Sequence, residues 1–451
     1  MTVTAPPRRP ETEQDRDLEQ RVAELEALIE EARRRARLRR LRNGGLLVAA
    51  GAAVAALVGL LGGGGGGGGT AALASDPGAR GQSSRSLASL APLPNGNKAN
   101  AFAFDPRRPD VVYVASFHAR GGVYVFKTTD GGQHWRLTRT HGAGWKSDIL
   151  SLTSDPSRPG TLYAGTDTAV YKTVDGGRNW RPFNRGLFPP PHKVCSTGLE
   201  RQCWKYPYYG TPGKANWNRG NGWVLDVAVD PNNRSVVYSA AGGVLKSTDG
   251  GHTWKSTLKL QAKWRSVTRI AIAPTRPESI YALAHNAGTG ATAIYKSTNP
   301  GRTWQRTGSA GSTLPLSCCG DSMDALVSDP ANPQTLYADV GNTVLRTTNG
   351  GASWQPAANG LPADSVTSLA IDPRQPGTVY ASVHNMSAVA LEIPTGGIYE
   401  TTNGGQTWTE IWSGFGVDKV AVDPTLPSTI YAAGNRLLKS TDGGHTWATS
   451  H

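Results

Sequence analysis

The pattern of apolar and polar positions between residues 97 and 451 repeats seven times. Each repeat has one short apolar run before an Asp-Pro turn and another after it, and a Tyr follows eight residues after the Asp. The turn positions are Asp105, Asp155, Asp230, Asp329, Asp372 and Asp423, with Ala273 replacing the Asp in the fourth repeat. Short apolar runs bounded by turn signals are typical of β-strands.

A second motif follows in every repeat, with an Asp or Asn five residues before a Trp. The seven pairs are Asp130 and Trp135, Asp175 and Trp180, Asp249 and Trp254, Asn299 and Trp304, Asn349 and Trp354, Asn403 and Trp408, and Asp442 and Trp447. Asp-Gly and Asn-Gly supply the positive φ angles of a tight hairpin, and the side-chain oxygen accepts from nearby backbone N–H groups. We expect each Trp to bury against a neighbouring sheet.

Each repeat therefore predicts four short antiparallel strands, and seven repeats predict an all-β, seven-bladed propeller over residues 97–451. One large insertion, residues 189–221, separates the second and third blades. The 55 Gly, 30 Pro and 13 Trp, with only 18% charged residues, suit such a turn-rich fold.

The first 43 residues differ in kind. Leu18, Val22, Leu25, Ile29 and Ala32 recur at spacings of four and three among Glu and Arg. This pattern predicts an amphipathic helix, and two interpretations stay open. The helix is either a short coiled coil that joins chains into a homo-oligomer or a single solvated helix.

Residues 44–64 predict one transmembrane helix, since Leu46 to Leu61 is apolar throughout. Arginines cluster on its N-terminal side, which predicts a cytoplasmic N-terminus and an extracytoplasmic propeller at the cell membrane. A cleavable signal peptide is the alternative, with Ala72 and Ala74 before Ser75. Residues 65–96, rich in Gly, Ser and Pro, predict a flexible tether.

The hairpin motif, S/T-x-D/N-x-G-x-x-W, resembles the Asp-box, or bacterial neuraminidase (BNR), repeat. The family includes sialidases, two-propeller xyloglucanases, sortilin-type receptors and the photosystem II assembly propeller. The resemblance covers residues 97–451 and implies a propeller in which the boxes are structural turns, away from the usual ligand face. It does not select a function.

Enzyme signatures are missing from the sequence. An Arg-Ile-Pro element of the sialidases is absent, as are GxSxG, HExxH, CxxC and P-loop motifs. A glycosidase needs two carboxylates at a characteristic separation, which the sequence does not pair. His118, His285 and His384 follow the second strands of blades that are not all adjacent, so we expect neither a metal site nor a cofactor.

Candidate binding residues lie on the face opposite the boxes. Four residues before the Asp-Pro position, the blades carry Ala101, Ser151, Asp226, Arg269, Ala325, Ser368 and Lys419. Asp226, Arg269 and Lys419 are thus predicted around the mouth of the central channel. Two interpretations stay open, solvated channel charges and a binding site.

The insertion is the second candidate. Trp204, Tyr206, Tyr208, Tyr209 and Trp217 alternate with Lys and Arg, which suits a carbohydrate, an anionic polymer or a protein surface. Packing of the aromatic residues onto the propeller is the alternative.

Cys195 and Cys203 are close enough in sequence to bridge the insertion, although the adjacent Cys318 and Cys319 leave three pairings open. Beyond residue 43 the chain has 36 Lys and Arg against 25 Asp and Glu. With the predicted topology, this basic charge favours anionic envelope components and makes nucleic acid an unexpected partner. The sequence favours a non-enzymatic module that binds a protein or polysaccharide, with a glycoside hydrolase or lyase as the alternative.

Overall fold

The computed structural model describes residues 90–94, 98–118, 122–138, 149–187, 193–195, 203–205, 223–260, 266–274, 279–285, 292–307, 325–340, 343–362, 365–375, 377–384, 396–414, 416–434 and 436–450. The predicted cytoplasmic helix, the predicted transmembrane helix and residues 65–89 of the predicted tether lie outside these residues. Within the described part of the chain, no helix has the length and apolar character to cross a bilayer.

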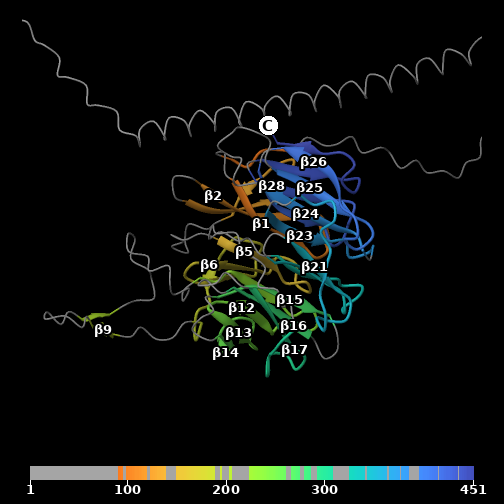
Figure 1. The fold of residues 1–451 in the computed structure, drawn as a ribbon. Helices are drawn as coiled ribbons and strands as arrows, with labels where there is room; N and C mark the ends of the chain where they lie inside the picture. Colours follow the sequence, from red (N-terminus) through yellow and green to blue (C-terminus); the bar gives the residue numbers. More distant parts are fainter. Residues whose placement is uncertain are drawn as a thin grey trace, which may run out of the picture. The chain divides into compact units, whose positions relative to one another are not determined.

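The described chain forms seven four-stranded antiparallel sheets, which confirms the predicted propeller (Figure 1). Blade 1 contains β1 (Lys98–Asp105), β2 (Arg108–His118), β3 (Gly122–Thr128) and β4 (Arg136–Leu137), and blade 2 contains β5 (Ile149–Ser154), β6 (Leu162–Thr166), β7 (Val170–Thr173) and β8 (Arg181–Pro182). Blade 3 contains β11 (Asp226–Val229), β12 (Val237–Ala240), β13 (Gly243–Ser247) and β14 (Lys255–Lys259), and blade 4 contains β15 (Ser266–Ala273), β16 (Ser279–His285), β17 (Thr292–Ser297) and β18 (Gln305–Arg306).

The remaining blades follow the same order. Blade 5 contains β19 (Leu326–Ser328), β20 (Leu336–Asp339), β21 (Val344–Thr347) and β22 (Gln355–Pro356), and blade 6 contains β23 (Ser365–Ile371), β24 (Val379–His384), β25 (Gly396–Thr401) and β26 (Thr409–Gly414). Blade 7 contains β27 (Val417–Val422), β28 (Ile430–Gly434), β29 (Leu437–Ser440) and β30 (Ala448–Thr449). The insertion contributes a separate two-stranded hairpin, β9 (Lys193–Cys195) and β10 (Cys203–Lys205).

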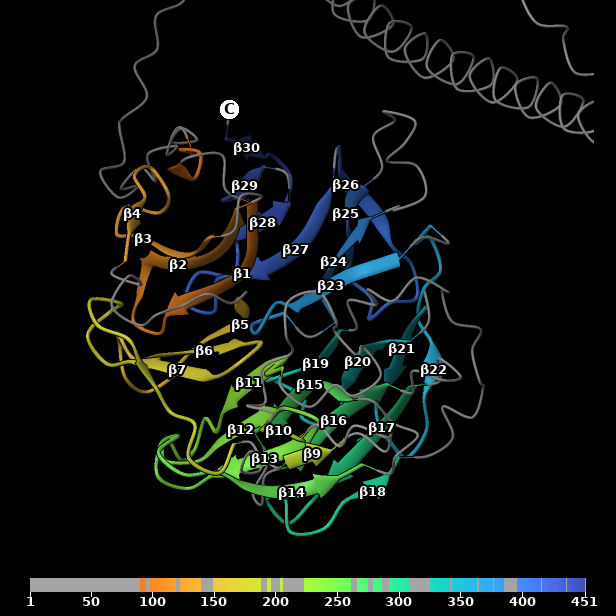
Figure 2. The ribbon, with the colours of Figure 1, turned by 90° about the vertical axis from the view of Figure 1, so that its left-hand side faces the viewer.

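The blades close into a ring around their first strands. β1, β5, β11, β15, β19, β23 and β27 each contact the next in this order, and β27 contacts β1. Figure 2 shows the blue last blade beside the orange first blade. Each sheet is built from consecutive strands, so no sheet combines strands from the two ends of the chain. Closure therefore depends on side-chain and turn contacts between blades 7 and 1.

The hydrophobic core is divided among the junctions between blades. Seven clusters of buried residues are found in the described chain, and each combines residues of two neighbouring blades. In blades 2, 3, 5 and 7, the second strand is buried along its whole length. Its continuous apolar sequence follows from this position, because neighbouring blades cover both of its faces.

The Asp-box turns have one hydrogen-bond pattern in all seven blades. The Ser or Thr two residues before the Asp or Asn donates to its Oδ1 at 2.7 to 3.0 Å. The same hydroxyl accepts from the N–H of the second Gly, and Oδ1 accepts the N–H of the residue before the Trp. Burial opposes ionisation of Asp130, but hydrogen bonds from Thr128 and His134 outweigh it and lower its pKa to about 2. The box is thus a folded turn whose carboxylate is already satisfied.

The box Trp packs on the preceding blade, as the sequence predicts for Trp180, Trp254 and Trp408, which are at most 5% exposed. The Nε1 atom of Trp254 donates to the Phe183 carbonyl of blade 2 at 2.8 Å. For blade 1, Leu90 and Leu93 pack against the box Trp and are 5% exposed. The packed region therefore begins before the predicted propeller boundary at residue 97.

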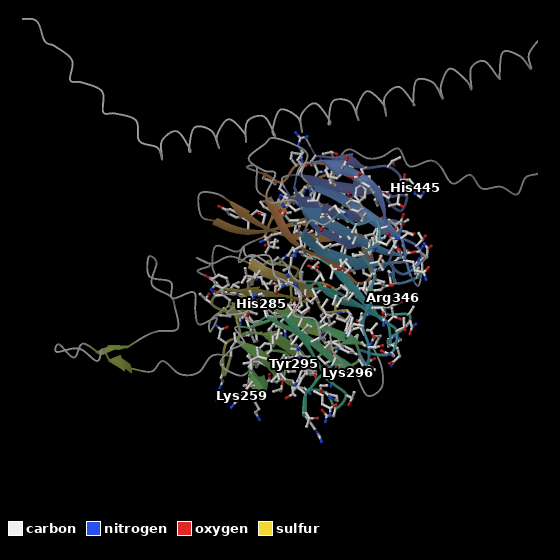
Figure 3. All side chains as sticks on the ribbon, in the orientation of Figure 1. Lys259, His285, Tyr295, Lys296, Arg346 and His445 are labelled. Carbon is white, nitrogen blue, oxygen red and sulfur yellow. The ribbon has the colours of Figure 1, made fainter. Side chains whose placement is uncertain are left out.

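A second joint runs in the opposite direction, from one blade to the box of the next. In blades 2, 4 and 7, the Tyr of the second strand and the Lys of the third strand converge on one box carbonyl. Tyr163 and Lys172 donate to Gly250 O at 3.2 and 2.8 Å, and Lys172 also lies over the Tyr163 ring. We call this arrangement the Tyr–Lys latch. It recurs at Gly350 and at Gly131, and Figure 3 labels one of its cations, Lys296 in blade 4.

Blade 6 has an acid, Glu400, at the latch position of the cation. Glu400 hydrogen-bonds Tyr380, whose hydroxyl reaches Gly443 O at 3.4 Å, against 3.1 to 3.2 Å for Tyr163, Tyr281 and Tyr431. A carboxylate cannot donate to the Gly443 carbonyl. We therefore expect Glu400→Lys to complete the latch and raise the free energy of unfolding by about 1 kcal/mol, measured by urea denaturation. The reverse change, Lys296→Glu, is the matched control and should destabilise; a destabilised Glu400→Lys variant would contradict the latch.

Candidate functional site

The first strands carry the predicted channel positions at a regular backbone irregularity. In blades 1, 2, 4, 6 and 7, a β-bulge falls directly before the channel position, which is Ala101, Ser151, Arg269, Ser368 or Lys419. Bulges re-aim the neighbouring side chain and increase the local twist. In five of the seven blades, the sequence motif thus marks a site where a side chain is turned away from the regular pleat.

Asp226 begins β11 and joins blade 3 to blade 4. Its Oδ1 accepts the N–H of Val227 at 2.9 Å, and its Oδ2 accepts the N–H of Ile270 at 2.8 Å. Burial raises the pKa of Asp226, and the positive charges of Arg269 and Lys419 and the two backbone N–H groups oppose this rise. Both carboxylate oxygens are therefore engaged by the propeller itself.

Arg269 and Lys419 approach Asp226 from two other blades. Lys419 on β27 interacts electrostatically with Arg269 on β15 and with Asp226 on β11. Blades 3 and 7 are not neighbours, so this electrostatic interaction acts across the ring. Asp226 and Lys419 keep part of their surface accessible, as expected for groups that protein encloses along a water-filled channel. The three predicted channel residues thus lie on the first strands of three blades and influence one another electrostatically.

Next to Lys419 lies a hydrogen-bonded His–Asp pair that the sequence did not reveal. His384 ends β24, and its Nδ1 lies 2.7 Å from Oδ1 of Asp418, the residue at the bulge of β27. The sequence contains a signal for this pair, since Asp418 directly precedes a channel position and His384 follows the repeat Tyr. His285, labelled in Figure 3, has the equivalent place in blade 4. In the described residues, no group of His, Cys, Asp and Glu has the arrangement of a metal site.

The opposite end of the channel is apolar. A hollow of about 360 Å³ is lined there by Ala271, Val327, Ile371 and Val422 of the first strands, together with prolines of the Asp-Pro turns. Charge is therefore concentrated at one end of the channel.

The insertion is described only at its hairpin. Cys195 pairs with Cys203 across β9 and β10, and Trp204 is a residue of β10. Directly paired residues of antiparallel strands lie at a separation that a disulfide spans, so the register is compatible with the predicted bridge. Tyr206, Tyr208, Tyr209 and Trp217 lie outside the described residues. Trp223, which follows the insertion, is 45% exposed.

Comparisons with known proteins agree on the fold. No protein-family model matches the chain. The xyloglucanase Xgh74A of Acetivibrio thermocellus is 29% identical over 192 residues, which cover 35% of this chain and 21% of the relative. The chain thus spans well under two thirds of that relative's length.

Solved structures give a wider likeness. An ancestral GH74 enzyme matches with a TM-score of 0.56 at 16% identity, covering 81% of this chain and 47% of its own. YCF48 bound to a D1 peptide matches with a TM-score of 0.50 at 14% identity, covering 77% and 95%, respectively. Sqt1 of Saccharomyces cerevisiae matches with a TM-score of 0.51 at 12% identity, covering 81% and 89%. The protein is a seven-bladed β-propeller similar to the propellers of GH74 enzymes and YCF48.

Proposed function

We propose that the protein is a membrane-anchored, extracytoplasmic propeller that binds a protein or polysaccharide ligand of the cell envelope at the mouth of its channel. One observation supports the proposal: Asp226, Arg269 and Lys419, from three different blades, interact electrostatically across the ring. The boxes join neighbouring blades, and the Asp-Pro carboxylates bind N–H groups of their own turns. We therefore assign ligand binding to the charged channel mouth.

The membrane anchor in this proposal rests on the sequence. The apolar run Leu46–Leu61 and the arginines before it predict one span with the propeller outside. The ligand class is supported by the neighbours, since one relative is named a xyloglucanase and YCF48 is described with a bound peptide. Such likeness supports a ligand class and not a reaction.

A glycoside hydrolase or lyase is the second candidate, supported by the similarity to Xgh74A. General acid catalysis requires a carboxyl group with a raised pKa, and burial gives Asp226 this property. Both of its oxygens, however, accept backbone N–H groups. This engagement favours a positioning role for Asp226 over proton transfer to a substrate.

The proposal is tested with the full-length protein on a panel of glycans and peptides. We expect binding without turnover, and we expect the Asp226→Ala, Arg269→Ala and Lys419→Ala triple variant to lose at least ~10-fold in affinity. The matched control replaces Lys255, Lys259 and Arg306, which are exposed on outer strands, with Ala. Unchanged binding by the channel variant would overturn the proposal, and turnover abolished by Asp226→Ala alone would establish the hydrolase.

A further inference from the structure

The chain enters the propeller at the Asp-box turn of blade 1. The Ala91 N–H donates to the Gly132 carbonyl at 3.0 Å, and Nε1 of Trp135 donates to the Ala91 carbonyl at 3.2 Å. Leu90 is 5% exposed and packs against the same box. Residues 90–94 are therefore fixed on the box face, and the chain that precedes them joins the propeller at that face.

Arginines gather in the turns beside this entry point. In blade 2 the Gly176 N–H of the box donates to the Gly160 carbonyl of the Asp-Pro turn at 2.8 Å, so both turns lie at one end of the blade. The corresponding turns of blades 5 and 7 contain no Lys or Arg. In the turns of blades 1 and 2, which are neighbours in Figure 2, four arginines are exposed, namely Arg107, Arg108, Arg158 and Arg178.

The charge of the ring is divided in the same way. Residues 98–187, which span blades 1 and 2, contain 13 Lys and Arg against 7 Asp. Residues 325–450, which span blades 5 to 7, contain 5 Lys and Arg against 10 Asp and Glu. The field of a charged surface orients a protein with such an asymmetry. An anionic surface therefore attracts the side of the ring at which the chain enters.

The acids of the arginine-rich turns are mostly engaged by the fold. Asp105 is buried and pairs with Arg108 at 2.7 Å, and Asp155 is buried and accepts N–H groups of its own turn. The box carboxylates accept hydrogen bonds within their own turns, and the exposed acid is Asp110. In the described part of the chain, no ion pair is found for Arg107, Arg158 or Arg178.

The anchor and tether that the sequence predicts limit the distance between this face and the membrane. The predicted span ends at residue 64 and the described chain begins at Leu90, which leaves 25 residues between them. A flexible linker of this length has a root-mean-square end-to-end distance of about 25–30 Å. Such a linker keeps the box face of blade 1 near the bilayer, where cations gain from anionic headgroups within a Debye length of about 10 Å.

We propose that the Asp-box face of blades 1 and 2 binds the anionic surface of the membrane through Arg107, Arg158 and Arg178. The inference rests on the proposed function, which places the propeller outside the membrane that anchors it. Phosphate groups of lipids match the guanidinium, which donates two parallel hydrogen bonds to them. Asp226 begins β11, at the end of the strand away from the Asp-Pro turn, so this placement turns the channel mouth toward the envelope.

The experiment uses the full-length protein in vesicles of phosphatidylcholine alone or of equal parts phosphatidylcholine and phosphatidylglycerol. A protease site introduced within the glycine run, residues 62–69, allows outward-facing propellers to be cut from the anchor. Sedimentation then measures the fraction of cut propeller that stays with the vesicles. At low salt we expect it to stay with the anionic vesicles and to leave the neutral ones. In about 1 M salt, where the Debye length falls to ~3 Å, it should leave both.

Replacing Arg107, Arg158 and Arg178 with Gln should lower the partition onto anionic vesicles by about tenfold or more, because each Arg near an anionic surface contributes roughly a factor of five. These side chains are exposed, so the variant should unfold in urea like the unaltered protein. A variant that keeps its full partition onto anionic vesicles would overturn the docking face.

The matched control removes the same charge elsewhere, with Lys255→Gln, Lys259→Gln and Arg306→Gln on the outer strands of blades 3 and 4, and it should stay on the anionic vesicles. Equal losses for the two triple variants would show that net charge alone acts and would refute the docking face. An unaltered propeller that leaves anionic vesicles at low salt but is retained on immobilised polyphosphate would refute it as well, and would assign the arginines to a polyanion. Failure of vesicle binding with intact binding of a panel ligand would leave the proposed function standing.

Discussion

Replacing Asp372 with Ala is expected to lower the free energy of unfolding by about 3 kcal/mol. The Asp372 side chain is buried at the Asp-Pro turn of blade 6 and is 2% exposed. Its Oδ1 accepts the N–H groups of Arg374 and Gln375 at 2.8 and 3.2 Å, and its Oδ2 accepts from the Gln375 side chain. Alanine removes the acceptor of both turn N–H groups and of the Gln375 side chain, and it leaves a space at a buried position. Urea denaturation followed by Trp fluorescence measures the change.

The control for this prediction is Asp372→Asn, which retains Oδ1 as the acceptor of the two backbone N–H groups. We expect Asp372→Asn to lower the free energy of unfolding by about 1 kcal/mol, because one acceptor and the charge are lost while the turn is kept. If Asp372→Ala and Asp372→Asn lower the free energy of unfolding equally, the charge of Asp372, and not its turn hydrogen bonds, stabilises the fold. The same geometry is found at Asp155, Asp230, Asp329 and Asp423, so the result applies to the repeat.

Removing the latch that closes the ring is expected to have the second large effect. Tyr431 and Lys439 of blade 7 donate to Gly131 O of blade 1 at 3.2 and 2.7 Å, and Lys439 lies 5.3 Å from the centre of the Tyr431 ring. The double variant Tyr431→Phe and Lys439→Met should lower the free energy of unfolding by about 3 kcal/mol. It should also unfold faster in urea, because no shared strand holds this junction.

The matched control is Tyr281→Phe with Lys296→Met. It removes the equivalent hydrogen bonds to Gly350 O, at 3.1 and 2.7 Å, between blades 4 and 5. The chain continues directly through that junction, whereas the closing junction joins residues 300 positions apart. A hollow of about 460 Å³ also lies at the closing junction, lined by Asp110, Tyr431 and Lys439 among others. If both double variants unfold at the same rate, the closing junction is not the weak point of the ring.

Much of the fold could be read from repeat spacing alone. The strand order, the seven turns at residues such as Asp130 and Asn349, and the short final strand β30 are local features with strong turn and hydrophobic patterns. The latch was not foreseen, although its Tyr is conspicuous in every repeat. The Lys that completes it lies on another strand, and their common acceptor lies in the next blade. Such a contact has no signature within one repeat.

The candidate site likewise combines features that the repeat predicts and contacts that it does not. The positions of Asp226, Arg269 and Lys419 in the repeat predicted that they line the channel, because equivalent positions of a radial repeat point to the same place. The backbone engagement of Asp226 and the hydrogen bond between Asp418 and His384 depended on how neighbouring blades are placed. These contacts decide which side-chain atoms already have partners, and composition does not contain that information.

By itself, the sequence determined the number of blades and the strands of each blade, because short-range turn chemistry and apolar spacing specify them. Only the tertiary structure decided how the blades are joined, where the ring closes and which channel side chains the fold engages. These properties arise from side chains that are far apart in the sequence and meet only after the seven blades have closed.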